Sequence, residues 1–123
     1  MDEQKKILVA DDDEVFLRLV DNDLTKEGYI VIKAQSGKDA VSLARAQKPN
    51  LILLDINMPD IGGGEVGEML KNDPRTKDIR VIFLTGLLTK KEEEEKGGMI
   101  GGQYFVAKPY DLKALLKEIE KHI

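Results

Sequence analysis

Short runs of apolar residues alternate along the whole chain with longer segments in which apolar residues recur every three or four positions. Apolar runs without polar alternation are typical of strands buried on both faces, and the longer periodic segments are typical of amphipathic helices. This alternation predicts an α/β fold in which helices cover both faces of a parallel sheet. The expected strands are 7–10, 29–33, 51–54, 81–84 and 103–107.

Helices are expected in the segments that follow these strands. An apolar stripe at Leu17, Val20 and Leu24 marks the first of them. The segment 57–64 contains Pro59 and three consecutive glycines, so an irregular loop is expected there. The helices are expected at 15–27, after Ser36, at 65–72, at 89–96 and after Asp111.

Two of these helices have recognisable start signals. Ser36 is followed three residues later by Asp39, an arrangement that resembles a capping box. Asp111 is the expected N-cap of the last helix, because an aspartate side chain can accept hydrogen bonds from the free amides of the first turn. The residues expected to face the core in these two helices are Ala40, Leu43, Ala44, Leu112, Leu115, Leu116 and Ile119.

Length and composition narrow the class of protein. The chain has 123 residues, of which 41% are hydrophobic and 34% charged, and this predicts one globular domain over residues 1–123. The formal net charge of −4 argues against direct nucleic acid binding, because phosphate backbones are held mainly by clustered lysine and arginine. The first apolar run, 7–10, is too short for a membrane span or a signal peptide, so a cytoplasmic location is expected.

The scarcity of cysteine and histidine excludes several kinds of site. The chain has no cysteine, which excludes disulfides, thiolate metal ligands and a cysteine nucleophile. His122 is the only histidine, so neither a two-histidine metal site nor a histidine-based triad can be built. It is expected to be a solvated residue at the end of the last helix, whose Lys113, Lys117 and Lys121 form an exposed stripe.

Polar residues stand directly after several of the expected strands. They are Asp11 and Asp12 after the first strand, Asp55 after the third, Thr85 after the fourth and Lys108 after the fifth. In a doubly wound parallel sheet the carboxyl ends of the strands face one crevice, so side chains distant in sequence can meet there. The sequence therefore predicts a single site built from these five residues.

Three carboxylates at one edge of a sheet repel one another unless a cation or a raised pKa removes the repulsion. Mg²⁺ is the obvious candidate, because it prefers oxygen ligands from one or two carboxylates, water and phosphoryl groups. Taken alone, the segment 11–13 fits the acidic start of a helix equally well. Asp55, directly after four aliphatic residues, is better explained as a nucleophile.

Four motifs resemble the signature of response-regulator receiver domains of two-component systems. They are V-A-D-D-D at 9–13, L-L-D-I-N-M-P at 53–59, F-L-T-G at 83–86 and F-V-A-K-P-Y at 105–110. Their order and spacing fit that family over essentially the whole chain. The resemblance implies a flavodoxin-like doubly wound (βα)5 three-layer sandwich with the strand order 2-1-3-4-5.

The resemblance also implies roles for the acidic residues. Asp55 would accept a phosphoryl group from a phosphohistidine on a partner, which is a sensor histidine kinase or a phosphotransfer protein. Asp12 and Asp55 would bind Mg²⁺ directly, Asp11 partly through water, and the backbone carbonyl of Asn57 would complete the protein ligands. The chain would not be an enzyme beyond self-phosphorylation from a donor and slow autodephosphorylation.

Lys108 and Thr85 would each contact a phosphoryl oxygen, and family resemblance implies a cis peptide between Lys108 and Pro109. Phe105 stands where receivers usually place the aromatic switch residue, although ordinary strand packing explains it equally well. Lys108 and Thr85, each taken alone, could also be a surface lysine and a strand-end hydroxyl. A downstream protein would bind the surface of the fourth helix, fifth strand and fifth helix.

Two departures from the family pattern concern the surface that would bind the downstream protein. Gly62 stands where an aspartate or serine is common, and the segment 97–102 is unusually rich in glycine.

Three alternatives remain open from the residues. A flavin-binding carrier would need a glycine- and hydroxyl-rich phosphate loop after the first strand, where three aspartates repel phosphate. A Mg²⁺-dependent phosphatase with an aspartate nucleophile would usually place it after the first strand and add a cap domain. A receiver-like module that binds partners without phosphorylation would not need the intact set of acids, threonine and lysine.

Overall fold

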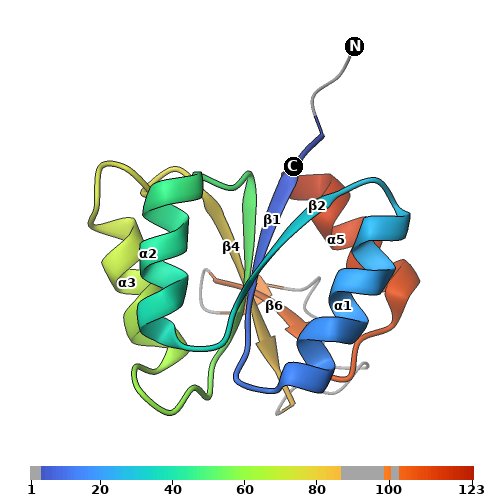
Figure 1. The fold of residues 1–123 in the computed structure, drawn as a ribbon, viewed down its shortest axis with the longest axis horizontal. Coiled ribbons are helices and arrows are strands. Elements are labelled where there is room, and N and C mark those ends of the chain that lie inside the picture. The colour runs from blue at the N-terminus through green and yellow to red at the C-terminus, as the bar shows by residue number, and fades with distance from the viewer. Residues whose placement is uncertain (1–3, 87–98, 101–102) are drawn as a thin grey trace.

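The strands of the computed structural model, which describes residues 4–86, 99–100 and 103–123, form one twisted sheet (Figure 1). The strand order is β2-β1-β3-β4-β6-β5. The first five strands in this order run parallel, and β5 pairs with β6 in the antiparallel sense. The strands are β1 (Lys6–Ala10), β2 (Ile30–Ala34), β3 (Leu51–Asp55), β4 (Arg80–Thr85), β5 (Met99–Ile100) and β6 (Gln103–Ala107).

Helices cover both faces of the sheet. Figure 1 shows α1 and α5 on one side of the strands and α2 and α3 on the other. The described helices are α1 (Glu14–Lys26), α2 (Gly37–Gln47), α3 (Gly63–Lys71) and α5 (Leu112–His122). The three-layer, doubly wound architecture and the order of the five parallel strands are therefore confirmed. The helix expected at 89–96 lies outside the described residues.

The central strand β3 shows why the fold needs two helical layers. Leu51 and Leu53 belong to the core cluster that includes residues of α1 and α5, while Ile52 and Leu54 belong to the cluster that includes residues of α2 and α3. All four side chains are fully buried. Because truncating a buried leucine to alanine costs about 2–5 kcal/mol, this strand contributes strongly to folding stability.

The caps expected from the sequence are present. Ser36 Oγ accepts a hydrogen bond from the amide of Asp39, and the Asp111 carboxylate accepts one from the amide of Ala114. The carboxylate of Asp13 accepts hydrogen bonds from the amides at positions 15 and 16 and so begins α1. Of the three consecutive aspartates, the third therefore serves the helix, which leaves the other two available for the site.

One helix boundary and one short strand differ from the sequence prediction. The helix α3 begins at Gly63, inside the segment expected to be an irregular loop. A Cβ at Gly63 would lie 2.3 Å from the carbonyl oxygen of Asp55, so glycine lets the helix start directly against the end of β3. The two-residue strand β5 was also missed, because a pair of apolar residues flanked by glycines has no strand-like pattern.

His122 is not the solvated residue that the sequence suggested. Its side chain is 9% exposed, and its ring centroid lies 4.2 Å from that of Tyr104 on β6. The helix α5 packs against the sheet through to its last turn, because Ile119 and Ile123 continue its apolar side into the core. The exposed stripe at Lys113, Lys117 and Lys121 is present on the opposite side.

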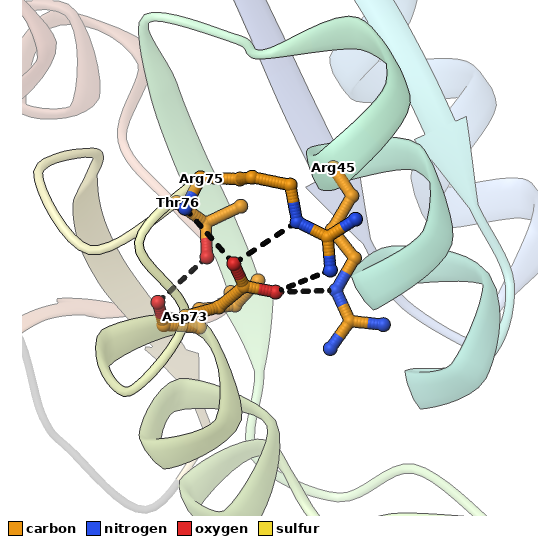
Figure 2. A network of polar contacts seen from close by, with 5 residues as sticks. Arg45, Asp73, Arg75 and Thr76 are labelled. Atoms are coloured by element: carbon orange, nitrogen blue, oxygen red, sulfur yellow. Dashed lines mark hydrogen bonds and ion pairs between the residues drawn. The ribbon is translucent and has the colours of Figure 1, made fainter.

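A network of charged side chains ties α2 to the loop that follows α3 (Figure 2). Asp73 accepts hydrogen bonds from Nε of Arg45 at 2.7 Å and from Nε and Nη2 of Arg75 at 3.1 and 2.9 Å. The hydroxyl of Thr76 donates to the carbonyl of Leu70. The hydrogen bonds from Arg75, and then the one from Arg45, hold the pKa of Asp73 well below its usual range despite its burial.

Among the described residues, no helix combines the length and the apolar character that a membrane span requires.

Candidate functional site

The predicted site lies at the carboxyl edge of the sheet. Asp11 directly follows β1, Asp55 and Thr85 are the last residues of β3 and β4, and Lys108 directly follows β6. The amide of Asp11 donates to the carbonyl of Ala34, which fixes the start of the β1–α1 loop. The sheet topology, rather than any local motif, therefore places these residues side by side.

Three carboxylates form a cluster at this edge. Each of Asp11, Asp12 and Asp55 offers an oxygen that lies within 4.8 Å of the others. Asp11 is fully buried, Asp55 is 6% exposed and Asp12 faces solvent. The amide of Asp13 donates to Asp11 Oδ1, so one oxygen of the buried acid has a backbone partner.

Lys108 brings the only ammonium that ion-pairs with this cluster among the described residues. Its Nζ lies 2.6 Å from Asp11 Oδ2 and 3.8 Å from Asp55 Oδ1. Its backbone amide donates to the carbonyl of Thr85, which ties the ends of β4 and β6 together. The Lys108–Pro109 peptide bond is cis.

The charges at this edge are not balanced. Burial and the neighbouring charge of Asp11 raise the pKa of Asp55, Lys108 partly offsets them, and Asp12 raises it further. A backbone hydrogen bond from Asn57 acts in the opposite direction. Burial alone lowers the pKa of Lys108, but its hydrogen bond and charge interaction with Asp11, and the charge of Asp55, outweigh burial and raise it. The site therefore keeps its lysine charged and retains an excess of negative charge.

The acid excess fits a hard divalent cation. Asp11, Asp12 and Asp55 supply oxygen donors, which Mg²⁺ prefers, and an exposed acid leaves room for water in the coordination shell. A bound cation would also remove the repulsion that raises the pKa of Asp55. The residues present therefore suit such an ion.

Asp60, which sequence reasoning missed, anchors the loop that follows β3. Its carboxylate accepts hydrogen bonds from the amides of Gly37 at 2.9 Å and Lys38 at 3.0 Å, at the start of α2. These two hydrogen bonds lower the pKa of Asp60 to about 2. A Cβ on Gly37 would lie 2.9 Å from the Cβ of Ile61, so the close approach of loop and helix requires glycine. The only sequence signal was an aspartate after proline.

Phe105 lies on the α2 and α3 side of the sheet. Its partly buried ring packs in that core cluster, with its centroid 5.5 Å from that of Phe83. Phe83 belongs to β4, two residues before Thr85. The structure therefore places Phe105 beside the strand that carries Thr85, and not among the acids themselves.

A doubly wound α/β fold whose carboxyl edge carries an acidic cluster and a lysine paired with it is typical of a class of small regulatory domains. A sequence model described as the response regulator receiver domain matches residues 7–120. The chain belongs to this family and is a receiver domain of the two-component type.

Individual relatives agree with the family assignment. The chain is 38% identical to protein PilH of Pseudomonas aeruginosa over 116 residues, which cover 93% of each chain. Its fold matches the N-terminal domain of a response regulator receiver protein from Methanoculleus marisnigri JR1, with a TM-score of 0.73 and 36% identity, over 97% of this chain and 96% of the other.

A third structure, the receiver domain of the sensor histidine kinase PA1611 from Pseudomonas aeruginosa PAO1, has a magnesium ion coordinated in its active-site cleft. It shares the fold, with a TM-score of 0.83 and 23% identity over 98% of each chain.

Proposed function

We propose that Asp55 is the phosphoacceptor of this receiver domain. The observation that carries the proposal is the crowding of Asp55 with Asp11 and Asp12, beside the ammonium of Lys108. Asp55 is the last residue of the central strand, so its carboxylate is held by a rigid part of the fold. Such a position suits in-line attack, in which orientation supplies much of the rate.

In the transfer step a carboxylate oxygen of Asp55 forms a bond to phosphorus. The bond from phosphorus to an imidazole nitrogen of the donor breaks at the same time, its electron pair stays on that nitrogen, and the ring, already protonated on its other nitrogen, leaves as neutral imidazole. The products are an aspartyl phosphate on this chain and a free histidine on the partner, so atoms and charges balance. The donor in this proposal is a phosphohistidine on a sensor histidine kinase or a phosphotransfer protein.

Lys108 and Thr85 are proposed to contact the phosphoryl oxygens. The Lys108 ammonium already lies within 3.8 Å of Asp55, so it can reach an oxygen of a group bonded there. Thr85 ends the neighbouring strand, directly after the residue that pairs with Asp55. Its hydroxyl is proposed to donate to a second phosphoryl oxygen, which would draw the end of β4 toward the site.

The cofactor proposed for the site is Mg²⁺, held by Asp12 and Asp55, with Asp11 partly through water and with the backbone carbonyl of Asn57. When bound, the ion would neutralise charge on the transferring oxygens. Asp11 and Asp12 are proposed to orient it, while Lys108 offsets the charge that remains.

The test is incubation with Mg²⁺ and a small acyl phosphate, followed by measurement of the intact mass. The wild type should gain one phosphoryl group, and hydroxylamine should release it, because acyl phosphates react with this nucleophile. Asp55→Asn keeps the size and shape of the side chain and should gain none, with unchanged circular dichroism. Asp60→Asn is the matched control, since it neutralises a carboxylate of the loop that follows β3 but should still be labelled.

Two outcomes would contradict the assignment. Labelling that survives Asp55→Asn would place the acceptor elsewhere, and steady release of phosphate from a generic phosphate ester would favour the phosphatase alternative. No turnover beyond self-phosphorylation and slow autodephosphorylation is expected, because the only proposed steps are formation of the aspartyl phosphate and its slow hydrolysis.

Phosphorylation is proposed to act on a downstream protein through the segment predicted as the fourth helix, with β6 and α5. Thr85 and Phe105 connect the site to this surface, because β4 and β6 are neighbours and Phe83 pairs with Phe105 in register. Movement of Thr85 toward a phosphoryl oxygen would leave space that the Phe105 ring can fill. Thr85→Ala should therefore weaken partner binding by the phosphorylated chain while labelling of Asp55 persists.

The proposal extends to the location of the domain and to the partners that it does not bind. We propose that residues 1–123 act as one receiver domain in the cytoplasm, without direct contact with nucleic acid or membrane. The net charge of −4 supports the expected lack of nucleic acid binding, since it disfavours approach to a polyanion.

A further inference from the structure

The ammonium of Lys108 has a third neighbour besides the two aspartates. Its Nζ lies 4.4 Å from the centroid of the Phe16 ring. An ammonium at this distance from an aromatic face is attracted by the negative charge of the ring face, most strongly where water is excluded. The Lys108 side chain is 23% exposed, so much of its water has been displaced.

Phe16 itself is held in place by two elements. Its backbone amide donates to the Asp13 cap, so it belongs to the first turn of α1. Its ring makes an edge-to-face contact with Tyr110, with centroids 5.9 Å apart and planes at 84°. Edge-to-face packing is one of the preferred geometries of aromatic pairs. The contact with Tyr110 therefore fixes the orientation of the Phe16 ring.

Tyr110 is in turn fixed by a hydrogen bond from its hydroxyl to Asp23 Oδ2. Burial, with this hydrogen bond and the charge of Asp23, raises the pKa of Tyr110, so the phenol stays protonated. Asp23 lies seven residues after Phe16, which is two helical turns, so both face the same side of α1. Tyr110 therefore spans these two turns, with its ring against Phe16 and its hydroxyl hydrogen-bonded to Asp23.

We propose that Phe16 is a positioning residue for Lys108, and that Tyr110, anchored by Asp23, keeps the Phe16 ring facing the ammonium. A lysine side chain is long and flexible, and Asp11 alone would draw its charge toward the buried side of the pocket. The aromatic face provides a neutral attraction that keeps the ammonium between Asp11 and Asp55. This inference rests on the proposed function, in which Lys108 contacts a phosphoryl oxygen.

The test is the rate constant for phosphorylation by a small acyl phosphate at saturating Mg²⁺. Phe16→Leu keeps an apolar side chain but removes the ring face, and it should slow phosphorylation by about threefold to tenfold. Phe16→Tyr restores an aromatic face and should recover most of the wild-type rate. Tyr110→Phe removes only the hydroxyl and should give a smaller reduction.

Tyr29→Leu is the matched control. Tyr29 is a partly buried aromatic residue packed against the same core cluster, but it precedes β2 and so lies at the opposite edge of the sheet. The control should lose stability without losing rate. Equal slowing by Tyr29→Leu, or a wild-type rate in Phe16→Leu, would overturn the positioning role.

A second measurement separates this inference from the proposed function. In the unphosphorylated wild type, the ε-methylene proton signals of Lys108 should be shifted upfield by the Phe16 ring, and Tyr110→Phe should reduce that shift. An unshifted signal would overturn the positioning role even if Asp55 is phosphorylated normally. A shifted signal in a chain that takes up no phosphoryl group would support the geometry and reject the proposed function alone.

Discussion

Two buried carboxylates of this receiver domain have opposite surroundings. Asp73 is 8% exposed and meets two arginines, so positive charge exceeds negative charge around it (Figure 2). Asp55 is 6% exposed and meets two further aspartates and one lysine, so negative charge is in excess. The pKa of Asp73 is lowered mainly by its hydrogen bonds, while burial and Asp11 raise that of Asp55.

The contrast separates a carboxylate whose charge is balanced within the fold from one that lies in an excess of negative charge. The Asp73 network satisfies its own acceptors and joins α2 to the loop after α3, so it needs no further partner. At the acidic edge of the sheet, the ammonium of Lys108 offsets only part of the negative charge of Asp11, Asp12 and Asp55. Burial of a charged group is therefore a weak guide to function unless the charge of its neighbours is counted as well.

The largest effect is expected from making the same substitution at both positions. Asp73→Asn should lower the thermal midpoint by roughly 5 °C or more, because it leaves two guanidinium groups without their shared carboxylate. Asp55→Asn should raise the midpoint by about 2 °C in the absence of divalent cations, because it relieves repulsion. Differential scanning calorimetry in a chelating buffer would measure both shifts. If both substitutions shifted the thermal midpoint in the same direction, the charge surroundings of Asp73 and Asp55 would not differ as argued.

A smaller effect is expected from the response to Mg²⁺. The ion should stabilise the wild type, by about 1.4 kcal/mol at a concentration ten times the dissociation constant, because it binds the folded acidic cluster. Asp12→Ala should erase most of this gain, and Asp78→Ala, which removes an exposed acid before β4, should retain it. Thermal midpoints recorded across a Mg²⁺ titration would measure the stabilisation of the wild type and of both variants. A full response in Asp12→Ala would place the ion elsewhere.

The smallest effect concerns Asp60, an exposed residue of the loop after β3, whose carboxylate oxygens accept backbone hydrogen bonds. Its pKa is lowered from 3.8 to about 2, so its contribution to stability is complete above pH 3.8 and is lost as the pH falls toward 2. Asp60→Asn should lower the midpoint by about 1 °C at neutral pH, because solvent screens this exposed carboxylate. The difference from the wild type should narrow over that acidic range, as a pH series of thermal melts would show. A difference that stays constant down to pH 2 would contradict this role.

Much of the fold could be predicted from the sequence. The unbroken apolar run 51–54 predicts a strand buried on both faces, and β3 is such a strand. Ser36 and Asp111 cap their helices as expected, because capping depends on residues only three positions apart. The boundary at Gly63 could not be predicted, because the closeness of its backbone to Asp55 depends on how α3 packs against β3.

The sequence by itself also indicated which residues converge at the carboxyl edge. In a parallel sheet the strand ends share one edge whatever the helices contain, so Asp11, Asp55 and Lys108 could be grouped without coordinates. Their ion pairs and the three-carboxylate cluster agree with that grouping.

Only the tertiary structure decided which polar and aromatic side chains support these residues. Asp60 meets Gly37 across 23 residues, Asp73 meets Arg45 across 28, and Tyr110 meets Asp23 across 87. Aspartate, arginine and tyrosine are common on protein surfaces. Helical or strand periodicity in the sequence does not predict which of these side chains will form hydrogen bonds with one another. That choice depends on the packing of helices against the sheet, which brings these partners within hydrogen-bonding distance only in the folded chain.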